Sequence, residues 1–279
     1  MADPFLIRAA RTADKRDVEA LCGRIWSDDY ILDVFDEWVR DRRGRLWVAV
    51  EDGQVVGIAK LTVYKSGESW LHGLRVDPDH RRRGIATALL ERRLARARAL
   101  GARVARLDTA ADNVAVQRLA RRFRFRRIAR VAGYAAPALA GERPRFPTGR
   151  DLPALRRLVG ERRAMLHQGH FVRELTPDDL TRAVRLRRCY AVGPEGDPSA
   201  FALVERLRDS EHGSRLLAQV IAGTRAGMGD LLWGLRAEAR ALRLARAGIT
   251  APDTQWPVVR ASGYKRRWPE TMLVFERRL

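Results

Sequence analysis

The chain has 279 residues, enough for one large domain or two of ordinary size, and 46% of them are hydrophobic, which is enough for a sizeable core. Its formal charge is +20, because 54 lysines and arginines outnumber 34 acidic residues. Such a charge favours anionic partners: a polyphosphate cofactor, a carboxylate substrate or nucleic acid. A solvated, partly ion-paired arginine surface explains the same composition, and the charge alone does not choose between the two.

Several protein classes are excluded at this stage. Every apolar run is shorter than the ~20 residues that span a bilayer, and the first residues lack the pattern of a signal peptide. The two cysteines, Cys22 and Cys189, are far apart and have no metal-ligand spacing. We therefore expect a cytoplasmic protein without a membrane segment, a disulfide or a metal site.

In chain order, the first third predicts a strand, two helices and a β-hairpin. The expected ranges are a strand at 7–9, helices beginning at 12–14 and spanning 28–39, and strands at 45–50 and 55–63. Glu51-Asp52-Gly53 is a good hairpin turn between the last two. Ile31, Phe35 and Trp38 recur at helical spacing, so we interpret that face of the second helix as core.

The stretch from residue 70 to residue 125 has the clearest pattern. A strand at 70–76 stops at Asp77-Pro78, and a basic glycine turn at 81–87 leads into a long helix with apolar residues on one side. We expect Arg92, Arg93, Arg96 and Arg98 to lie off that side. A strand at 103–107, a short helix after Asn113 and the alternating run 123–125 follow, which predicts an α/β sandwich with a mixed sheet.

The second half repeats this order of elements. Residues 135–147 are rich in alanine, proline and glycine and predict a linker. Then come a helix at 151–159, strands at 188–192, 200–204 and 215–222, a glycine turn at 223–229, a helix capped by Asp230, and strands at 244–249 and 271–275. We infer a tandem repeat of one fold, with domains at 1–140 and 148–279.

The glycine turn is the candidate phosphate site. A glycine turn that opens a helix presents backbone N–H groups at the positive end of the helix dipole, where a pyrophosphate can bind. Gly84 and Ala86 let the ligand approach the backbone, and three arginines add positive charge. The predicted contacts are Arg81, Arg82, Arg83, Gly84, Ile85, Ala86 and Thr87.

This stretch resembles the GNAT superfamily of N-acetyltransferases. Arg81, Gly84 and Ala86 match the family's phosphate motif: Arg or Gln, two variable residues, Gly, one variable residue, then Gly or Ala. The strand end at 74–76 resembles the one that pairs with the pantetheine arm. The resemblance covers residues 7–134. It implies acetyl-CoA as cosubstrate, an amine as acceptor, and further contacts from Leu74, Arg75, Val76 and Asn113. The implied fold is α/β (α+β), a mixed and mostly antiparallel sheet flanked by helices, in two tandem GNAT-like copies.

The sequence departs from the family pattern in three places. Ala120 stands where the family often has a tyrosine that protonates the departing thiolate, but a thiol with a pKa of ~8.5 is a fair leaving group without it. Arg124 replaces the usual glycine before the aromatic Phe125, which leaves the course of the final strands open. In the second copy Thr224 replaces the Arg or Gln, so we expect that degenerate copy to be structural or to shape the substrate site.

His72 is the candidate general base. An attacking amine must be neutral, and some GNAT members that resemble this chain have a glutamate at this position. Imidazole, with an unperturbed pKa of ~6.5, suits the role, although a hydrogen-bonded structural histidine is an equally good interpretation. We expect His72 to share a strand face with Trp70 and Leu74, and Gly73 to leave the other face open. Backbone N–H groups near residues 74–76 could stabilise the developing oxyanion.

Asp29 and Tyr30 lie where the family's substrate-facing helices usually fall, and this segment, with the tandem arrangement, resembles histidine N-acetyltransferase-like proteins. The resemblance implies an N-acetyltransferase that moves the acetyl group to the primary amine of a small molecule, such as an amino acid, by direct attack in a ternary complex. The positive charge disfavours polyamines.

Two alternatives stay open. Arg121 to Arg127 interleave arginines with phenylalanines, which would suit an RNA-associated or protein acetyltransferase, although strand alternation explains the same pattern more simply. A non-catalytic CoA-binding regulator is the other alternative.

Overall fold

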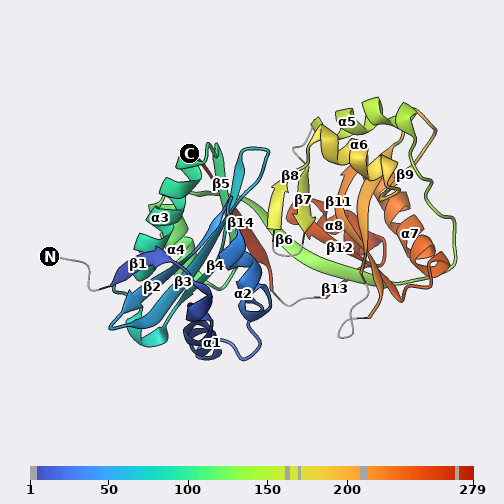
Figure 1. Cartoon of the computed structure of the whole chain (residues 1–279). Helices are drawn as coiled ribbons and strands as arrows, with labels where there is room; N and C mark the ends of the chain where they lie inside the picture. Colours follow the sequence, from blue (N-terminus) through green and yellow to red (C-terminus); the bar gives the residue numbers. More distant parts are fainter. Residues whose placement is uncertain (1–4, 161–163, 169–170, 208–212, 268–269) are drawn as a thin grey trace. The chain divides into compact units, whose positions relative to one another are not determined.

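The computed structural model describes residues 5–160, 164–168, 171–207, 213–267 and 270–279. The chain forms two compact units. The first unit contains Met1–Thr109, Asn113–Arg127 and Phe275–Leu279, and the second contains Ala110–Asp112 and Ile128–Val274. Residues 128–140, expected in the first domain, lie in the second unit, and the last five residues of the chain lie in the first. Figure 1 shows the elements of both.

The first unit is a sheet covered by helices on both faces. Its elements are β1 (Leu6–Ala9), α1 (Lys15–Gly23), α2 (Ile31–Arg40), β2 (Arg45–Glu51), β3 (Gln54–Val63), β4 (Glu68–Val76), α3 (Ile85–Ala99), β5 (Val104–Ala110) and α4 (Val114–Arg122). The strands lie in the order β1-β2-β3-β4-β5. Successive pairs among them are antiparallel except β4–β5, which is parallel. The expected mixed and mostly antiparallel sheet is confirmed.

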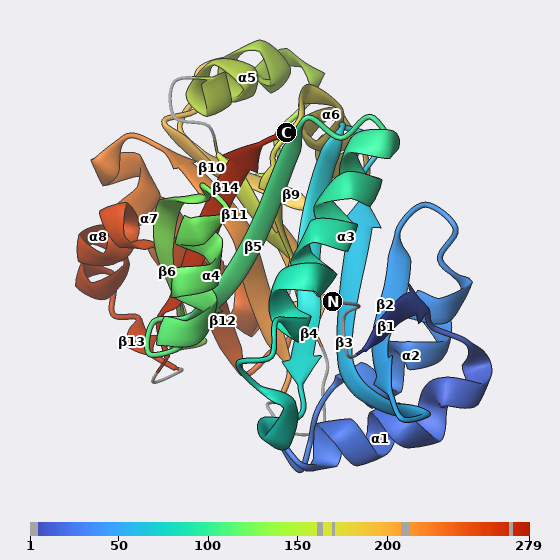
Figure 2. The same cartoon turned by 90° about the vertical axis from the view of Figure 1, so that its left-hand side faces the viewer.

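Side chains alternate between the two faces of this sheet. Val48 and Ile58 pack against Phe35 of α2 in one buried cluster, which confirms the apolar face of α2 as core. On the other face Gly57 lets α3 approach closely, since a Cβ at this position would lie 2.8 Å from Ile85. Figure 2 shows α3 lying along the strands on this face.

One arginine of α3 contradicts the expected pattern. Arg93 is only 2% exposed, and its Nε donates to the carbonyl oxygen of Leu89 at 3.2 Å, whereas Arg92 and Arg98 are exposed. Position 93 lies four residues after Leu89, one turn further along the same apolar side of the helix. Burial lowers the pKa of Arg93 to about 9, because the charged form loses its water.

The segment after α4 differs from the sequence prediction in two ways. Residues 123–125 are not a strand: Phe123 ends α4, and Arg124 adopts a left-handed conformation with φ 60°. This is the conformation for which the family's glycine is suited, so Arg124 preserves the turn and Phe125 is buried behind it. Strand β6 (Arg126–Pro137) then includes Ala135 and Ala136, which pair with β12; the predicted linker at 135–147 was therefore wrong for residues 135–137. An alanine-rich segment can be either a closely packed strand or a linker, so composition alone does not distinguish the two.

The second unit has the same layers as the first. Its elements are β6, α5 (Leu152–Gly160), β7 (Met165–Gln168), β8 (Phe171–Glu174), α6 (Pro177–Arg185), β9 (Cys189–Val192), β10 (Ala200–Leu207), β11 (Arg215–Gly223), α7 (Arg225–Ala241), β12 (Arg246–Pro252), α8 (Trp256–Ala261) and β13 (Lys265–Arg266). The last strand, β14 (Met272–Arg278), begins in the second unit and ends in the first. Strands run in the order β6-β12-β11-β10-β9. One buried cluster joins the sheet to α7 and α8, and another joins it to α5 and α6.

The predicted glycine turn at 223–229 is largely helical. Helix α7 begins at Arg225, and its cap is Thr224, whose hydroxyl accepts from the backbone N–H of Gly227 at 3.1 Å. Asp230 lies inside the helix and is not the cap. The glycines misled the prediction because glycine is common in turns, while here it allows close packing. The hairpin β7–β8 and helix α6 were not predicted.

The same ion pair precedes the first α-helix of each unit. Asp14 receives two hydrogen bonds from Arg8, at 2.6 and 2.7 Å, and one from the backbone N–H of Arg11. Asp151 receives two from Arg145, both 2.8 Å, and one from the backbone N–H of Thr148. In each case the aspartate follows its arginine by six residues and directly precedes a helix. This repeated local structure supports a tandem origin.

Candidate active site

Strands β4 and β5 separate in the middle of the first unit. Among the described residues they pair at three positions, Glu68 with Val104, Ser69 with Ala105 and Trp70 with Arg106. Beyond that point β4 continues to Val76 and β5 to Ala110 without pairing each other. Leu74-Arg75-Val76, expected at the pantetheine contact, lies on the unpaired part of β4. An extended ligand can therefore form hydrogen bonds with backbone groups on this side of the strand.

A β-bulge lies at the start of this opening. The β3–β4 register shifts between Ile58 and Lys60, and Gly73 has φ 62°. A Cβ on Gly73 would lie 2.7 Å from Trp38, so the expectation that Gly73 leaves an open face was wrong. The bulge also interrupts the alternation: His72 contacts Trp38 of α2, whereas Leu74 lines a cavity with α3 and α4. The expected common face of His72 and Leu74 was wrong for the same reason.

The glycine turn at the start of α3 has the geometry of an anion site. Gly84 is the cap residue with φ 90°, no side chain caps the helix, and its first turn holds no acidic residue. The backbone N–H groups of Ile85, Ala86 and Thr87 precede the first intrahelical bond, which Ala88 donates to Gly84. Arg82 is also left-handed, with φ 62°. Successive left-handed and right-handed residues form a concave array of N–H groups that suits a phosphate.

Ion pairs anchor this turn to its surroundings. Asp77 accepts from the backbone N–H of Asp79 at 2.9 Å, from Arg24 at 2.8 Å, and lies 3.0 Å from Nδ1 of His80. Arg83 forms an ion pair with Glu51, so its guanidinium is directed to the β2–β3 hairpin. Arg81 and Arg82 are exposed. Of the three predicted arginines, these two are the better placed for a phosphate.

A cavity of about 320 Å³ lies next to the turn. Leu74 of β4, Ala86 of α3 and Leu119 of α4 line it, together with Ala115, Val116, Arg118 and Arg122. Asn113 holds the start of α4 in place, because its side-chain oxygen accepts from the backbone N–H of Val116 at 3.2 Å. The cavity is apolar with two arginines in its lining, a combination that suits an aliphatic amide arm attached to phosphates. These residues fit acetyl-CoA, with its pyrophosphate at the turn.

The other side of the opening faces α1 and α2. Arg75 donates to both carboxylate oxygens of Asp29, at 2.7 and 3.0 Å, and its guanidinium stacks 4.2 Å from the ring centre of Trp26. Asp29 also accepts from the backbone N–H of Ile31. The carboxylate of Asp29 therefore positions Arg75 and α2, an arrangement that leaves little capacity for a substrate. Tyr30, at the start of α2, lies 6.0 Å from Trp38, ring centre to ring centre.

His72 is buried on this side of the sheet. Its Nε2 lies 3.0 Å from the hydroxyl of Thr62, and its ring centre lies 4.7 Å from that of Trp38, edge to face. It thus stands on the α2 side of β4, close to the point at which β4 and β5 separate. Both earlier interpretations, general base and hydrogen-bonded structural residue, are compatible with these contacts.

Asp108 is a candidate that sequence reasoning missed. It lies on the part of β5 that no longer pairs with β4, and burial raises its pKa to about 7. Burial raises the pKa of Tyr30 to about 12, and the charge of Asp108 adds to this shift. A carboxyl group with a pKa near neutrality is a suitable general base. The available signal was an acidic residue directly after the strand expected at 103–107.

The corresponding features of the second unit are filled by its own side chains. Strands β11 and β12 pair up to Ala218 and Ile249 and not beyond, but the side chain of Gln255 donates to the carbonyl oxygen of Ile221 at 3.1 Å. The hydroxyl of Thr224 caps α7. A Cβ at Gly227 would lie 2.6 Å from Ser199, so the start of α7 is closely packed.

No helix among the described residues is long and apolar enough to cross a membrane. Within the same residues, no cluster of three or more histidine, cysteine or acidic side chains has the arrangement of a metal site.

Comparison with known proteins agrees with this geometry. Residues 13–125 match the acetyltransferase (GNAT) family. No curated protein sequence matches the chain significantly. Solved structures that are similar over nearly the whole chain include a GCN5-related N-acetyltransferase from Sphaerobacter thermophilus, with 15% identity and a TM-score of 0.64 over 100% of this chain and 96% of that one. A candidate acetyltransferase from Thermoplasma acidophilum, also 15% identical, has a TM-score of 0.63 over 98% of this chain and 100% of that one.

At this level of identity the solved structures establish the fold alone, and they do so across both units. The family match covers the residues that form the separated strands, the uncapped helix start and the cavity. Residues 13–125 therefore form a domain of the acetyltransferase (GNAT) family, the family of acetyl-CoA-dependent N-acetyltransferases.

Proposed function

We propose that the first unit transfers the acetyl group of acetyl-CoA to the primary amine of a small molecule, such as an amino acid, in a ternary complex. The observation that carries the proposal is the contrast between the units. In the first, β4 and β5 separate beside a helix start without a side-chain cap; in the second, Gln255 and Thr224 occupy the equivalent positions. One acetyl-CoA per chain follows from this contrast.

The two sides of the opening bind different substrates. Acetyl-CoA, when bound on the α3 and α4 side, supplies a thioester carbonyl. The turn at Gly84 and the exposed Arg81 and Arg82 hold its phosphates, and backbone N–H groups of the unpaired part of β4 stabilise the negative charge that develops on the carbonyl oxygen. The acceptor amine enters from the α1 and α2 side, where Trp26 is exposed.

The acceptor must lose a proton as its nitrogen forms the new C–N bond and the C–S bond breaks. Asp108 and His72 are the two candidates for this proton. Asp108 has the better-matched pKa, about 7, and lies on the unpaired part of β5. His72 lies on the neighbouring strand and is held by Thr62. In the family a tyrosine often protonates the thiolate, but the alanine at the equivalent position 120 has no proton to donate, so we infer that the thiolate takes its proton from water.

The direct test is thiol release from acetyl-CoA against a panel of amino acids, amino sugars, polyamines, peptides and tRNA. We expect acetylation of a small primary amine, with polyamines poor because the chain carries a charge of +20. Efficient transfer only to a peptide or to RNA would establish the alternative acceptor class. CoA binding without thiol release from any amine would identify a non-catalytic regulator.

A further inference from the structure

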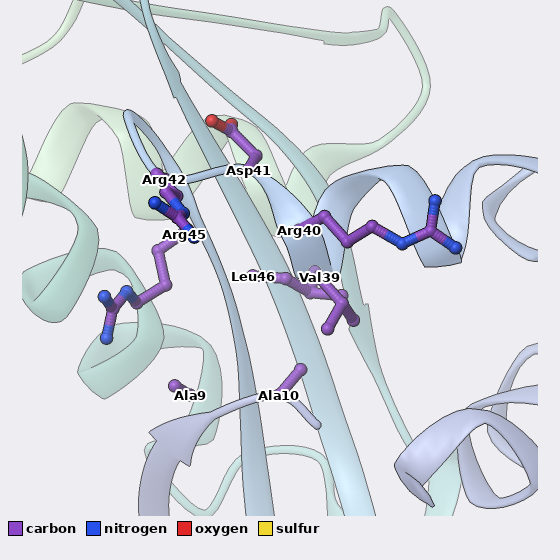
Figure 3. A pocket seen from close by; sticks show the side chains of 8 residues that line it. All are labelled: Ala9, Ala10, Val39, Arg40, Asp41, Arg42, Arg45 and Leu46. Carbon is purple, nitrogen blue, oxygen red and sulfur yellow. The ribbon is translucent and has the colours of Figure 1, made fainter. Parts of the chain in front are cut away.

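Two neighbouring hollows lined by arginines lie in the first unit. One, of about 500 Å³, lies between the end of α2, the end of β1 and the start of β2, and Arg40, Arg42 and Arg45 contribute to its lining (Figure 3). The other, of about 400 Å³, lies between β1, β2 and α3, and Arg8, Arg45, Arg92 and Arg96 contribute to it. Ala9 and Arg45 line both, so the two hollows adjoin at the edge of the sheet, one on the α2 side and one on the α3 side; together we call them the arginine groove.

Most of the positive charge of the arginine groove is not neutralised by the protein. Among the described residues no carboxylate forms an ion pair with Arg42, Arg45, Arg92 or Arg96, whereas Arg8 is paired with Asp14. The Nε of Arg96 is buried and has no hydrogen-bond partner within the described part of the chain.

The one carboxylate in the lining, Asp41, already has partners. It accepts from buried Lys60 and from the backbone N–H groups of Arg43 and Gly44. In Figure 3 the side chains of Arg42 and Arg45 lie on the same side of the hollow, and Arg40 points to the other.

The shape and chemistry of the groove favour phosphates in a chain. Like charges held together without counter-charges repel each other, and an anion that bridges them removes this cost. Each hollow has the size of a small-molecule site, and a flexible single strand can follow the arginines from one to the other around the edge of the sheet, whereas a duplex is too stiff to bend around it. Trp47 is only 4% exposed and offers no stacking surface, so contacts would be to the backbone and not to the bases.

The arginine groove is separate from the acetyl-CoA site. Tyr30 is at the beginning of α2 and Arg40 at its end, about 15 Å along the helix axis. Likewise the phosphate turn precedes α3, and Arg92 and Arg96 lie about 10 to 17 Å further along that helix. None of the residues that line the acetyl-CoA cavity lines either hollow.

We propose that the arginine groove binds the phosphodiester backbone of a single-stranded nucleic acid. Binding is independent of base sequence, because recognition depends on charge, and it decreases steeply with salt.

The test is fluorescence anisotropy with labelled 15-nucleotide single strands, one of RNA and one of DNA, over a series of salt concentrations. For single strands each phosphate contact contributes about 0.7 to the slope of log K against log[salt]. We expect Arg42→Ala/Arg45→Ala to reduce the slope by about 1.4, and Arg92→Ala/Arg96→Ala, in the other hollow, to do the same. Arg42→Lys/Arg45→Lys should retain most of the slope because it keeps the charge.

The matched control is Arg185→Ala/Arg240→Ala, which removes two exposed helical arginines outside the groove and changes the net charge equally. If this control reduces the slope as much as the groove variants do, binding reflects net charge and the proposal fails. If 10 mM inorganic phosphate displaces the labelled oligonucleotide at constant ionic strength, the proposal also fails, and the groove is a small-anion site. Unchanged thermal unfolding of each variant shows that lost binding is not lost folding. Tighter binding of RNA than of DNA would identify RNA as the preferred ligand. Equal binding would show that the groove recognises only the phosphodiester backbone, and either result supports the proposal.

Discussion

The guanidinium of Arg106 and the carboxylate of Glu276 are 170 positions apart in the chain, yet Nε of Arg106 donates to Oε2 of Glu276 at 2.8 Å. Both residues belong to the first unit, in which Arg106 is 1% exposed and also pairs with Glu68. The backbone N–H of Leu279 donates to the carbonyl oxygen of Arg103 at 3.0 Å. The end of the chain therefore completes the unit that carries the proposed acetyl-CoA site.

The first prediction concerns this contact. Glu276→Gln should destabilise the first unit by about 1–3 kcal/mol, because a buried guanidinium loses one of its two carboxylates. The measurement is urea unfolding of each variant. The readout is how well the backbone amides of the proposed acetyl-CoA-binding residues stay protected from hydrogen exchange. Arg278→Gln, at an exposed position two residues away, should change little. Equal stability of the two variants would show that Glu276 contributes nothing to the unit.

The second prediction concerns the phosphate turn. Gly84 and Gly101 stand at the two ends of α3, with φ 90° and 74°, and in neither case would a Cβ meet another atom within 4 Å. Gly84→Ala and Gly101→Ala should therefore lose about 1 kcal/mol of stability each, through backbone strain alone. Only Gly84→Ala should raise KM for acetyl-CoA, since it alone distorts the N–H array. Parallel kinetics and thermal melts of the two variants check this, and an equal rise in KM would disprove it.

The third prediction distinguishes Asp108 from His72. If Asp108 is the base, the rate rises with pH around 7, as its carboxyl group loses a proton, and Asp108→Asn abolishes this rise. His72→Ala should then lower the rate without moving the midpoint of the profile. The opposite pattern assigns the base to His72. If neither variant changes the rate or its pH dependence, both assignments are wrong.

The pH dependence of stability tests the raised pKa of Asp108 independently of the kinetics. Its folded pKa, about 7, lies above the ordinary 3.8, so the folded state binds the proton more tightly than the unfolded one. The protein therefore loses stability from this group as pH rises from about 4 to 7. Asp108→Asn should stabilise the protein at pH 8, on the order of 2 kcal/mol, and have little effect at pH 4. A destabilising effect at pH 8 would contradict the raised pKa.

The fourth prediction concerns the ion pair that precedes the first α-helix of the second unit. The pKa of Asp151 is lowered to about 2, first by the hydrogen bonds from Arg145 and then by backbone N–H groups of Thr148 and Gly196. A lowered folded pKa contributes stability above pH 4, which is lost as pH falls towards 2. Asp151→Asn should thus cost about 2 kcal/mol at pH 7 and much less at pH 2. Unfolding midpoints of the variant and the parent protein across this range provide the check; a constant difference would mean that charge is not involved.

The sequence predicted the features that depend on local rules. The turn at Gly84 followed from a glycine between a strand and a helix, and the hairpin at Asp52-Gly53 from its turn residues. The same rules failed where tertiary packing determines the local structure. The glycines near Gly227 predict a turn, but they allow α7 to pack on Ser199. Ala135 predicts a linker, but it lies in a sheet.

The site was predicted less completely than the fold. The bulge at Gly73 changes the face of every later residue in β4, and a strict two-residue period could not reveal it. The pairing of Asp29 with Arg75 joins residues 46 positions apart, so a predicted substrate ligand became a structural one. Asp108 was missed because its raised pKa comes from burial that only the folded chain provides.

The most direct test of the account is calorimetric titration of acetyl-CoA into the parent protein and two variants of α4. Ala115 lines the acetyl-CoA cavity, whereas the neighbouring Val114 is 51% exposed and does not. The account predicts one acetyl-CoA per chain, loss of binding in Ala115→Trp, which fills the cavity, and normal binding in Val114→Trp. Two acetyl-CoA per chain, or undiminished binding by Ala115→Trp, would contradict it.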